Sequence, residues 1–297
     1  MTIRSRCEVL SARKNGAYQA VTLVAPDIAE KARPGQFIEV AMPEGRAAFL
    51  RRPFFVHETS RRGGWAGTLE FVVEPDGPET QWLAEIKPHQ FLDAIGPLGK
   101  PFGYPKKRVA CMLVSEGYGA APLYFLAEEL RAQGHRVDMI VGAPTQDLVL
   151  KPIEAKRLSR TIAVVTGDGT IGDKGHVMDV LPHVVARSRS QVIYAAGPRP
   201  MLKQVAEYCR ANRIPAQVAV EERMACGLGL CWSCVVPVAR RYGEGYEHVR
   251  ACVDGPAINA QRILWDRWGE AIPPPTPPEG FPAVEGLAEL LERPAGV

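Results

Sequence analysis

In the middle of the chain, short apolar runs alternate with helical patterns, and this alternation restricts the possible folds more than any other feature of the sequence. The runs "RVACMLVSEG", "HRVDMIVGA", "RTIAVVTGDG", "QVIYAAG" and "AQVAVEE" have the length and composition of buried strands. Helices are predicted between them over 121–134, 176–188 and 199–212. Strands joined through helices are connected by crossovers and form a parallel sheet. We therefore expect an α/β nucleotide-type domain over residues 105–220, with "AQVAVEE" as its last strand.

Each predicted helix carries apolar residues at i, i+3, i+4 and i+7, and such residues share one helical face. Gly134 is expected to end the first helix. The residues expected to face the core are Leu123, Leu126, Ala127 and Leu130, then Val177, Val180, Leu181 and Val184, then Leu202, Val205, Ala206 and Cys209.

The first hundred residues show a β-rich pattern instead. The runs "YQAVTLVAP", "GQFIEVAMP", "RPFFVHET" and "GTLEFVVEP" are rich in β-branched and aromatic residues and are separated by Gly and Pro. Several short strands at this spacing predict a barrel or a sandwich over residues 1–104. Residues 94–103, "AIGPLGKPFG", are predicted to be a tight turn at its end. The expected fold class is a β domain followed by an α/β domain.

Four of the 7 cysteines form the pattern C-x4-C-x2-C-x17-C, with Cys226, Cys231, Cys234 and Cys252. Zinc sites usually use two C-x2-C pairs, and only one such pair is present here. The x4 gap instead matches the plant-type [2Fe–2S] spacing. The spacing therefore favours a [2Fe–2S] cluster, with zinc or a chance grouping as the alternatives.

Two glycines inside this cysteine run have a physical role in the cluster hypothesis. Gly227 and Gly229 can take positive φ values, so the backbone can turn its N–H groups toward the sulfurs. The remaining cysteines lie in predicted strands or helices and are expected to be core thiols. They are Cys7, Cys111 and Cys209.

Composition excludes some classes of protein. The net charge of +3 is too small to indicate a nucleic acid or an anionic membrane as partner. No apolar run reaches the roughly 18 residues of a membrane span, and the start "MTIRSRCEVLSARK" lacks the apolar core of a secretion signal. We therefore expect a cytoplasmic protein, in which thiols stay reduced and disulfides are disfavoured.

Weaker signals indicate nucleotide binding. Arg52 in "FLRRPFFV" is a candidate for a dinucleotide pyrophosphate, although a basic pair at a strand start is also typical of a solvated edge. Gly117 and Gly119 open the first predicted helix, as a partial glycine motif that a plain strand–helix turn would also show. Gly197 follows a later strand at its carboxyl end, where open α/β sheets bind ligands. The run "VGAPTQD" has no Arg or Lys to meet a 2′-phosphate, which favours NAD over NADP.

In combination and in this order, the motifs "PGQFIEV", "LRRP", "IGPLGKPF", "GDGTIGDKGHVMDVL", "EERMACGLGLCWSC" and "CVDGP" resemble the electron-transfer subunits of class 1B dihydroorotate dehydrogenase, within the ferredoxin reductase-like flavoproteins. The resemblance covers roughly residues 5–260. It implies an FAD-binding β-barrel, an NAD-binding α/β domain and a [2Fe–2S] module over residues 221–262. A Pro-rich tail is expected over 263–297.

The resemblance also implies the reaction and the partner. In that family, electrons from dihydroorotate enter FMN on a separate catalytic subunit, cross the cluster to FAD and leave as hydride to NAD+. The implied setting is pyrimidine biosynthesis, in a heterotetramer. The charged run Glu221–Arg223 either orients the cluster loop or is simply solvated.

Site residues follow from the resemblance position by position. The cluster ligands are the four cysteines above. The sequence departs from the family pattern at Phe55 (usually a hydroxyl residue), Val73 (usually arginine), Glu79 (usually glycine) and Ala196 (usually cysteine). The implied flavin residues are Arg52, Pro53, Phe54 and Phe55, then Phe71, Val72 and Val73, then Glu79 and Thr80.

These departures keep two other functions open. One is an NAD(P)H:acceptor reductase subunit that serves a different oxidoreductase. The other is a binding protein held together by a metal, with nucleotide sites that have decayed.

Overall fold

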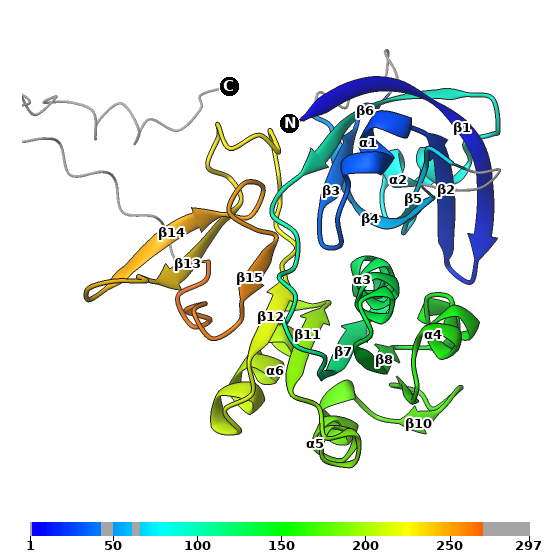
Figure 1. Ribbon diagram of the computed structural model, residues 1–297. Coiled ribbons are helices and arrows are strands. Elements are labelled where there is room, and N and C mark those ends of the chain that lie inside the picture. Colours follow the sequence, from blue (N-terminus) through cyan, green and yellow to red (C-terminus); the bar gives the residue numbers. More distant parts are fainter. Residues whose placement is uncertain (1, 43–49, 61–65, 270–297) are drawn as a thin grey trace, which may run out of the picture. The chain divides into compact units, whose positions relative to one another are not determined.

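The computed structural model describes residues 2–42, 50–60 and 66–269. The predicted Pro-rich tail lies outside these residues from position 270 onward. Residues Met1–Trp265 form one compact unit, which contains a barrel and an α/β sheet (Figure 1). The boundaries predicted within this unit, after residues 104, 220 and 262, stay predictions.

The β-rich part is a closed antiparallel barrel, which decides between the barrel and the sandwich. Its strand order is β1-β2-β5-β4-β3-β6. The four predicted strands are present, and β1 and β6 were not predicted. The strands of the barrel are β1 (Ile3–Asn15), β2 (Tyr18–Val24), β3 (Phe37–Val40), β4 (Arg52–Ser60), β5 (Thr68–Val73) and β6 (Phe91–Leu98).

The turn predicted over residues 94–103 is wrong in its first half. Strand β6 continues to Leu98, and the chain turns only at Gly99, which has a φ of 76°. Leu92, Ala94 and Leu98 are buried and alternate with more exposed residues, which is the period of a strand with one buried face. Glycine and proline obscured this period in the sequence.

Two short helices pack on the barrel, α1 (Pro26–Lys31) and α2 (Pro78–Ala84). Ile28 of α1 and Leu83 of α2 are buried in the barrel's apolar core. Helix α2 begins after Gly77, whose backbone N–H donates to the Thr80 hydroxyl at 2.9 Å. Thr80 therefore stabilises the first turn of this helix.

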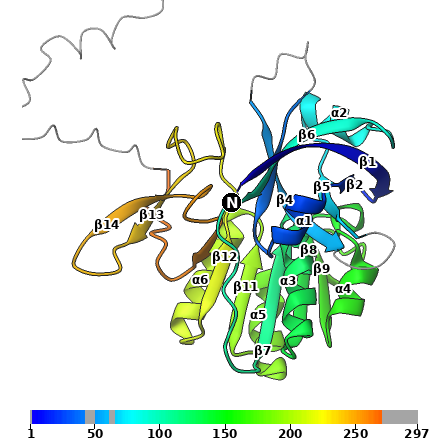
Figure 2. The same cartoon turned by 45° about the horizontal axis from the view of Figure 1, so that its top comes forward.

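The second half of the unit is a seven-stranded sheet in the order β10-β9-β8-β7-β11-β12-β15. Its strands are parallel except β15, which pairs antiparallel with β12. Helices α3 and α4 lie on the face toward the barrel, and α5 and α6 cover the other face (Figures 1 and 2). The elements are β7 (Ala110–Glu116), β8 (Arg136–Ala143), β9 (Ile162–Thr166), β10 (Asp173–Lys174), β11 (Val192–Ala196), β12 (Ala216–Ala219), β15 (Ala257–Asn259), α3 (Ala120–Ala132), α4 (Pro152–Leu158), α5 (Val177–Ser188) and α6 (Arg199–Ala211), with short 3-10 turns η1 (Gly117–Gly119) and η2 (Gln146–Leu148).

The sheet does not end where the sequence predicted. Beyond β12, which lies in "AQVAVEE", strand β15 adds an edge from the far side of the cysteine run. The cysteine-bearing segment is thereby joined to the α/β sheet. It also contains a hairpin of β13 (Val235–Ala239) and β14 (Tyr246–Arg250).

The predicted helix faces are confirmed for α3 and α6, whose four core positions are all buried. In α5 the buried row is instead Val177, Leu181 and Val185. These residues are spaced by four, so they form one i, i+4 ridge against the sheet. Among the described residues, no helix is both long and apolar enough to cross a membrane.

Candidate functional site

The four cysteines come together in the loop between β12 and β13 and just after β14. All are free thiols, and they lie as two neighbouring pairs, Cys226 with Cys231 and Cys234 with Cys252. Within the described residues, no three His, Cys, Asp or Glu side chains are placed to hold a single metal ion. Two pairs of thiols suit a centre of two irons, each bound by two thiolates, better than one zinc ion.

The loop backbone already points toward sulfur. The N–H groups of Leu228, Leu230 and Cys231 donate to Cys226 Sγ at 3.4, 3.3 and 3.5 Å. This turn depends on Gly227 and Gly229, with φ values of 60° and 84°. The donors, the thiols and the glycine turn fit a [2Fe–2S] cluster, whose anionic sulfurs accept such N–H bonds.

The two pairs differ in their environment. Cys231 is exposed, and hydrogen bonds with Ser233 and then Cys226 lower its pKa to about 6. Cys252 is buried, and burial together with the Cys234 thiol raises its pKa to about 12. One side of the cysteine loop therefore faces solvent and the other faces the protein interior.

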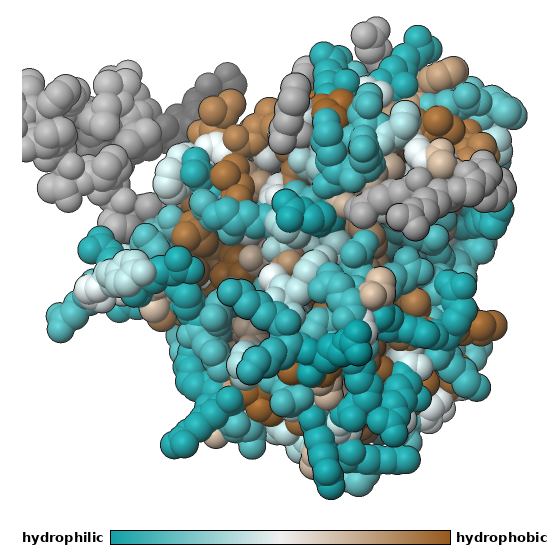
Figure 3. Space-filling model, in the orientation of Figure 1, coloured by the Kyte–Doolittle hydropathy of each residue, from teal (hydrophilic) through white to brown (hydrophobic). Residues whose placement is uncertain are grey.

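Apolar side chains are exposed around the solvent side of the cysteine loop. Figure 3 shows hydrophobic residues gathered over the segment that Figure 1 draws between β12 and β13. The guanidinium of Arg250 lies 4.8 Å from the centre of the Trp232 ring. We call the exposed apolar residues here the loop patch. They are Leu228, Leu230, Trp232 and Val253.

Next to the cysteine loop lies a pocket with an aromatic wall, which we call the apolar pocket. Three of the predicted flavin residues, Pro53, Phe54 and Phe55, line it from β4. Its other lining residues come from β3, from η1 and from the chain that enters and leaves the cysteine loop. They are Phe37, Tyr118, Val220, Glu221, Glu222, Met224 and Pro256.

The predicted glycines Gly117, Gly119 and Gly197 line a second pocket, the glycine cleft, at the carboxyl ends of β7 and β11. A Cβ on Gly119 would lie 2.3 Å from the Ala196 carbonyl oxygen, so only glycine fits there. The structure thus brings the three glycines to one ligand-sized cleft. Its other lining residues are Tyr18, Glu74, Glu116, Tyr118, Pro144, Leu148, Pro198 and Glu221.

Tyr118 lines both pockets, and the sequence analysis missed it. The Phe55 backbone N–H donates to the Tyr118 hydroxyl oxygen at 3.3 Å, and the two ring centres are 6.4 Å apart. Burial, and then the Glu221 carboxyl, raises the pKa of Tyr118. The available signal was an aromatic residue between the two glycines of a strand–helix turn.

Glu221 is the other residue shared by both pockets. Burial and the neighbouring Glu74 raise its pKa to about 7. Of the charged run, Glu221 and Glu222 line the apolar pocket, whereas the Arg223 carbonyl accepts a 3.4 Å hydrogen bond from the Ser233 hydroxyl inside the cysteine loop. The run therefore links the pocket to the loop.

The other predicted flavin residues do not line either pocket. Arg52 forms a 2.7 Å ion pair with Glu79, and the Thr80 hydroxyl is used in the α2 cap. Phe71 and Val73 lie in the barrel core, and Val72 is fully buried. Their contact with a flavin stays a prediction, and for β5 it would have to use backbone groups.

A third pocket continues the glycine cleft along the carboxyl ends of β7, β8 and β9, with Glu116 and Pro144 in both. None of the described residues that line it is a lysine or arginine. This lining suits the adenosine half of a nicotinamide dinucleotide that has no 2′-phosphate. The preference for NAD over NADP stays a prediction.

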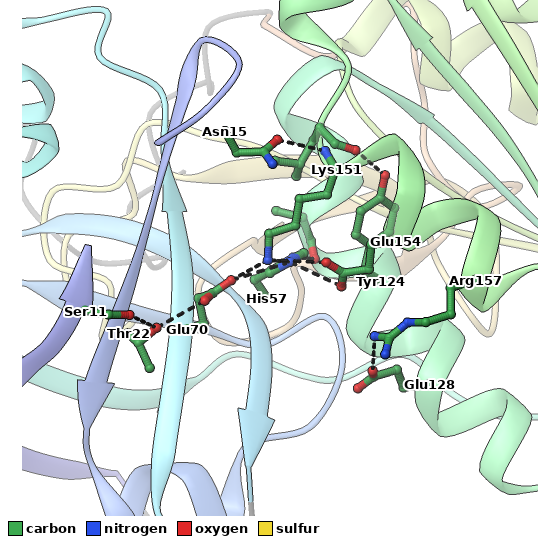
Figure 4. A network of polar contacts seen from close by, with 12 residues as sticks. Ser11, Asn15, Thr22, His57, Glu70, Tyr124, Glu128, Lys151, Glu154 and Arg157 are labelled. Atoms are coloured by element: carbon green, nitrogen blue, oxygen red, sulfur yellow. Dashed lines mark hydrogen bonds and ion pairs between the residues drawn. The ribbon is translucent and has the colours of Figure 1, made fainter. Parts of the chain in front are cut away.

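A separate polar cluster joins the barrel to the α/β half (Figure 4). Lys151 Nζ lies 2.5 Å from Glu70 Oε1, 3.3 Å from Glu154 Oε2 and 3.0 Å from His57 Nε2. Because an ammonium group only donates, His57 Nε2 accepts and its Nδ1–H donates to the Ala121 carbonyl at 2.9 Å. Burial, and then Lys151, lowers the pKa of His57, which keeps the ring neutral.

Comparison with known proteins agrees with this geometry. Residues 221–264 match the family model described as the iron–sulfur cluster binding domain of dihydroorotate dehydrogenase B. The dihydroorotate dehydrogenase B (NAD(+)) electron transfer subunit of Desulforamulus reducens is 33% identical over 242 residues, which cover 82% of this chain and 90% of that protein. The chain belongs to this family of electron-transfer subunits. The Geobacillus thermodenitrificans member is 32% identical over 267 residues, covering 88% of this chain and 98% of its own.

Solved structures place the family in a wider fold group. An NADH-dependent reduced ferredoxin-NADP oxidoreductase aligns with a TM-score of 0.77 and 28% identity, over 89% of this chain and 91% of that one. The ferredoxin reductase of carbazole 1,9a-dioxygenase shares the fold, with a TM-score of 0.60 and 21% identity over 72% of this chain and 67% of its own. The predicted resemblance and fold class are confirmed.

Proposed function

We propose that this electron-transfer subunit carries electrons between an FMN-containing, dihydroorotate-oxidising subunit and NAD+, using a [2Fe–2S] cluster and FAD. The cluster would be held by Cys226, Cys231, Cys234 and Cys252. The flavin ring would occupy the apolar pocket, and NAD the glycine cleft and its continuation.

One observation carries the proposal, namely that the three sites share walls. Met224 lines the apolar pocket and stands two residues before Cys226. Tyr118 and Glu221 line both the apolar pocket and the glycine cleft. A flavin in the apolar pocket would therefore lie between the cluster and the nicotinamide, as the exchange of single electrons for a hydride requires.

The overall reaction balances without an additional reactant. Dihydroorotate gives up two electrons and two protons, NAD+ takes two electrons and one proton, and the second proton goes to water. When bound, the cluster would supply single-electron transfer and the flavin would supply hydride transfer. The protein's residues bind and orient these groups, and the aromatic walls exclude water from the flavin ring.

The loop patch is the proposed contact surface for the catalytic subunit. It surrounds the solvent side of the cysteine loop, and its most exposed residue is Leu230, at 79%. An electron donor has to approach the cluster closely, and exposed apolar residues in one group are typical of a protein interface. Docking there would bring the donor to the exposed side of the cysteine loop.

The test uses the full chain purified without oxygen. We expect iron and inorganic sulfide in equal amounts, bound FAD, and dihydroorotate-dependent reduction of NAD+ when the FMN-containing subunit is added. Replacing a ligand, Cys231→Ala, should remove the cluster absorbance, whereas the same change at the buried helix residue, Cys209→Ala, should leave it. A colourless protein that contains zinc would contradict the proposal.

A second candidate is an NAD(P)H-linked reductase subunit for a different oxidoreductase. Two observations favour it: Phe55 stands where the family usually has a hydroxyl residue, and the ferredoxin-NADP oxidoreductase above aligns over most of the chain. Iron, sulfide and flavin would then be present as before. NADH would reduce them, but the dihydroorotate-oxidising subunit would neither bind the chain nor support NAD+ reduction.

A further inference from the structure

Strand β3 separates two environments by the alternation of its side chains. Ile38 and Val40 belong to the apolar core of the barrel. Phe37 and Glu39 point to the opposite side, because successive side chains of a strand alternate. Phe37 lines the apolar pocket, and Glu39 pairs in register with Pro53, which lines the same pocket.

Glu39 lies against the cysteine loop. A Cβ built on Gly227 would be 2.0 Å from Glu39 Oε1, so the carboxyl occupies the space that any other residue would need there. Gly227 follows the first cysteine of the predicted cluster directly. Glu39 therefore stands between the pocket proposed for the flavin and the loop proposed for the cluster.

One oxygen of the buried Glu39 carboxyl is left without a partner in the described part of the chain. Glu39 is 2% exposed, and its Oε1 has no hydrogen-bond partner among the described residues. The guanidinium of Arg51 donates to Asp93 Oδ1 at 2.7 Å, and its hydrogen bond to Glu39 goes to the backbone carbonyl, at 3.5 Å. Burying an unpaired carboxyl destabilises a fold, and an apolar residue would pack on this strand without that cost. Barrel stability does not explain a glutamate at this position.

We infer that Glu39 is a positioning residue for electron transfer, whose carboxyl against the cysteine loop lowers the reduction potential of the iron–sulfur centre. The inference rests on the proposed function, since it requires a cluster on this loop. A negative charge nearby disfavours adding an electron to an anionic cluster, and the low dielectric of a buried site strengthens this interaction. A residue of the barrel would thus adjust the reduction potential of the cluster relative to that of the flavin.

The test is a redox titration of the cluster, followed by electron paramagnetic resonance at pH 9 in the loaded full chain. Two neutral replacements, Glu39→Gln and Glu39→Leu, should both move the midpoint potential to higher values. Glu58→Gln is the control, because Glu58 is also a barrel glutamate, although half-buried, and its charged neighbours are Glu70, Glu128, Glu154 and Lys151. The control should keep the wild-type potential.

The outcomes separate this inference from the proposed function. A wild-type potential in either neutral variant that holds its cluster would overturn the role of Glu39, while leaving the function intact. If the Gln variant does not assemble a cluster, the Leu variant decides. Wild-type protein without iron and sulfide would instead refute the proposed function itself. A structural role alone would change cluster yield without moving the potential.

Discussion

At the residue scale, Tyr118 is one of the two side chains that the apolar pocket and the glycine cleft share. It stands on the short turn η1 between two glycines and forms part of both walls. Its hydroxyl oxygen also accepts a hydrogen bond from the backbone N–H of Phe55. Phe55 stands at the position where the family usually has a hydroxyl residue. An aromatic ring at this place contributes both contact area and a polar group.

We expect Tyr118→Leu to weaken NADH binding or flavin retention about tenfold, which corresponds to about 1.4 kcal/mol. Tyr118→Phe should have a smaller effect, since it keeps the ring and loses one hydrogen bond worth about 1 kcal/mol. Flavin content and the KM for NADH in a dye-reduction assay measure both. Tyr242→Leu, at an exposed tyrosine in the β13–β14 hairpin, is the control. Equal losses in the Tyr118→Leu and control variants would contradict the assignment.

At the scale of elements, the barrel and the α/β half are held together by the Lys151 cluster shown in Figure 4. Burial lowers the pKa of Lys151, but Glu70 and Glu154 outweigh this and raise it overall, so the lysine is charged. Lys151→Met should reduce the free energy of unfolding by about 3 kcal/mol, because it leaves the carboxylates of Glu70 and Glu154, each only 17% exposed, without their ammonium partner. Thermal or denaturant unfolding measures the loss.

The control for this change is Lys203→Met, which removes an exposed i,i+4 pair with Glu207 on α6. A surface pair of this kind contributes about 0.3 kcal/mol. If the free energy of unfolding falls by the same small amount in both variants, the Lys151 cluster does not stabilise the contact between the barrel and the α/β half.

Glu58 of β4 gives a prediction about pH. Burial, and then Glu70, raises its pKa from 4.5 to about 7 in the folded protein. Between these values the folded state binds more protons than the unfolded state, so Glu58 reduces stability as pH rises from about 4.5 through 7. The difference in free energy of unfolding between Glu58→Gln and wild type should therefore shift in favour of the variant by on the order of 1 kcal/mol from pH 5 to pH 8, after allowing for solvent screening. Parallel unfolding experiments at both pH values check this, and a pH-independent difference would count against it.

At the scale of the whole molecule, the loop patch is the surface that we propose for contact with the catalytic subunit. Leu230→Ser should weaken binding to the catalytic subunit by at least tenfold, about 1.4 kcal/mol, while iron, sulfide and FAD contents stay at wild-type levels. Ile153→Ser on α4 is the matched control, because Ile153 is also a highly exposed aliphatic residue but lies outside the patch. Analytical ultracentrifugation or calorimetry with the purified partner would show the difference.

Much of the architecture could be predicted because its signals are local. The alternation of strands and helices indicated the α/β half, and the helix periodicities of α3 and α6 located their buried faces correctly. The cysteine spacing indicated a binuclear cluster, since loop length limits which thiols can meet. Strand β6 was missed because Gly96 and Pro97 interrupt a period of two that only burial reveals.

The sequence by itself therefore determined the class of fold and the family, and it predicted the four thiols as ligands; all of these depend on residues close together or on motifs in a fixed order. The tertiary structure alone decided that Tyr118 and Glu221 join two pockets, that β15 extends the sheet, and that Glu39 lies against Gly227. It also left Phe71 and Val73 in the barrel core rather than on a pocket wall. Pocket walls and buried charges are made by residues from distant segments. Their meeting depends on how the strands register and pack, which no local pattern specifies.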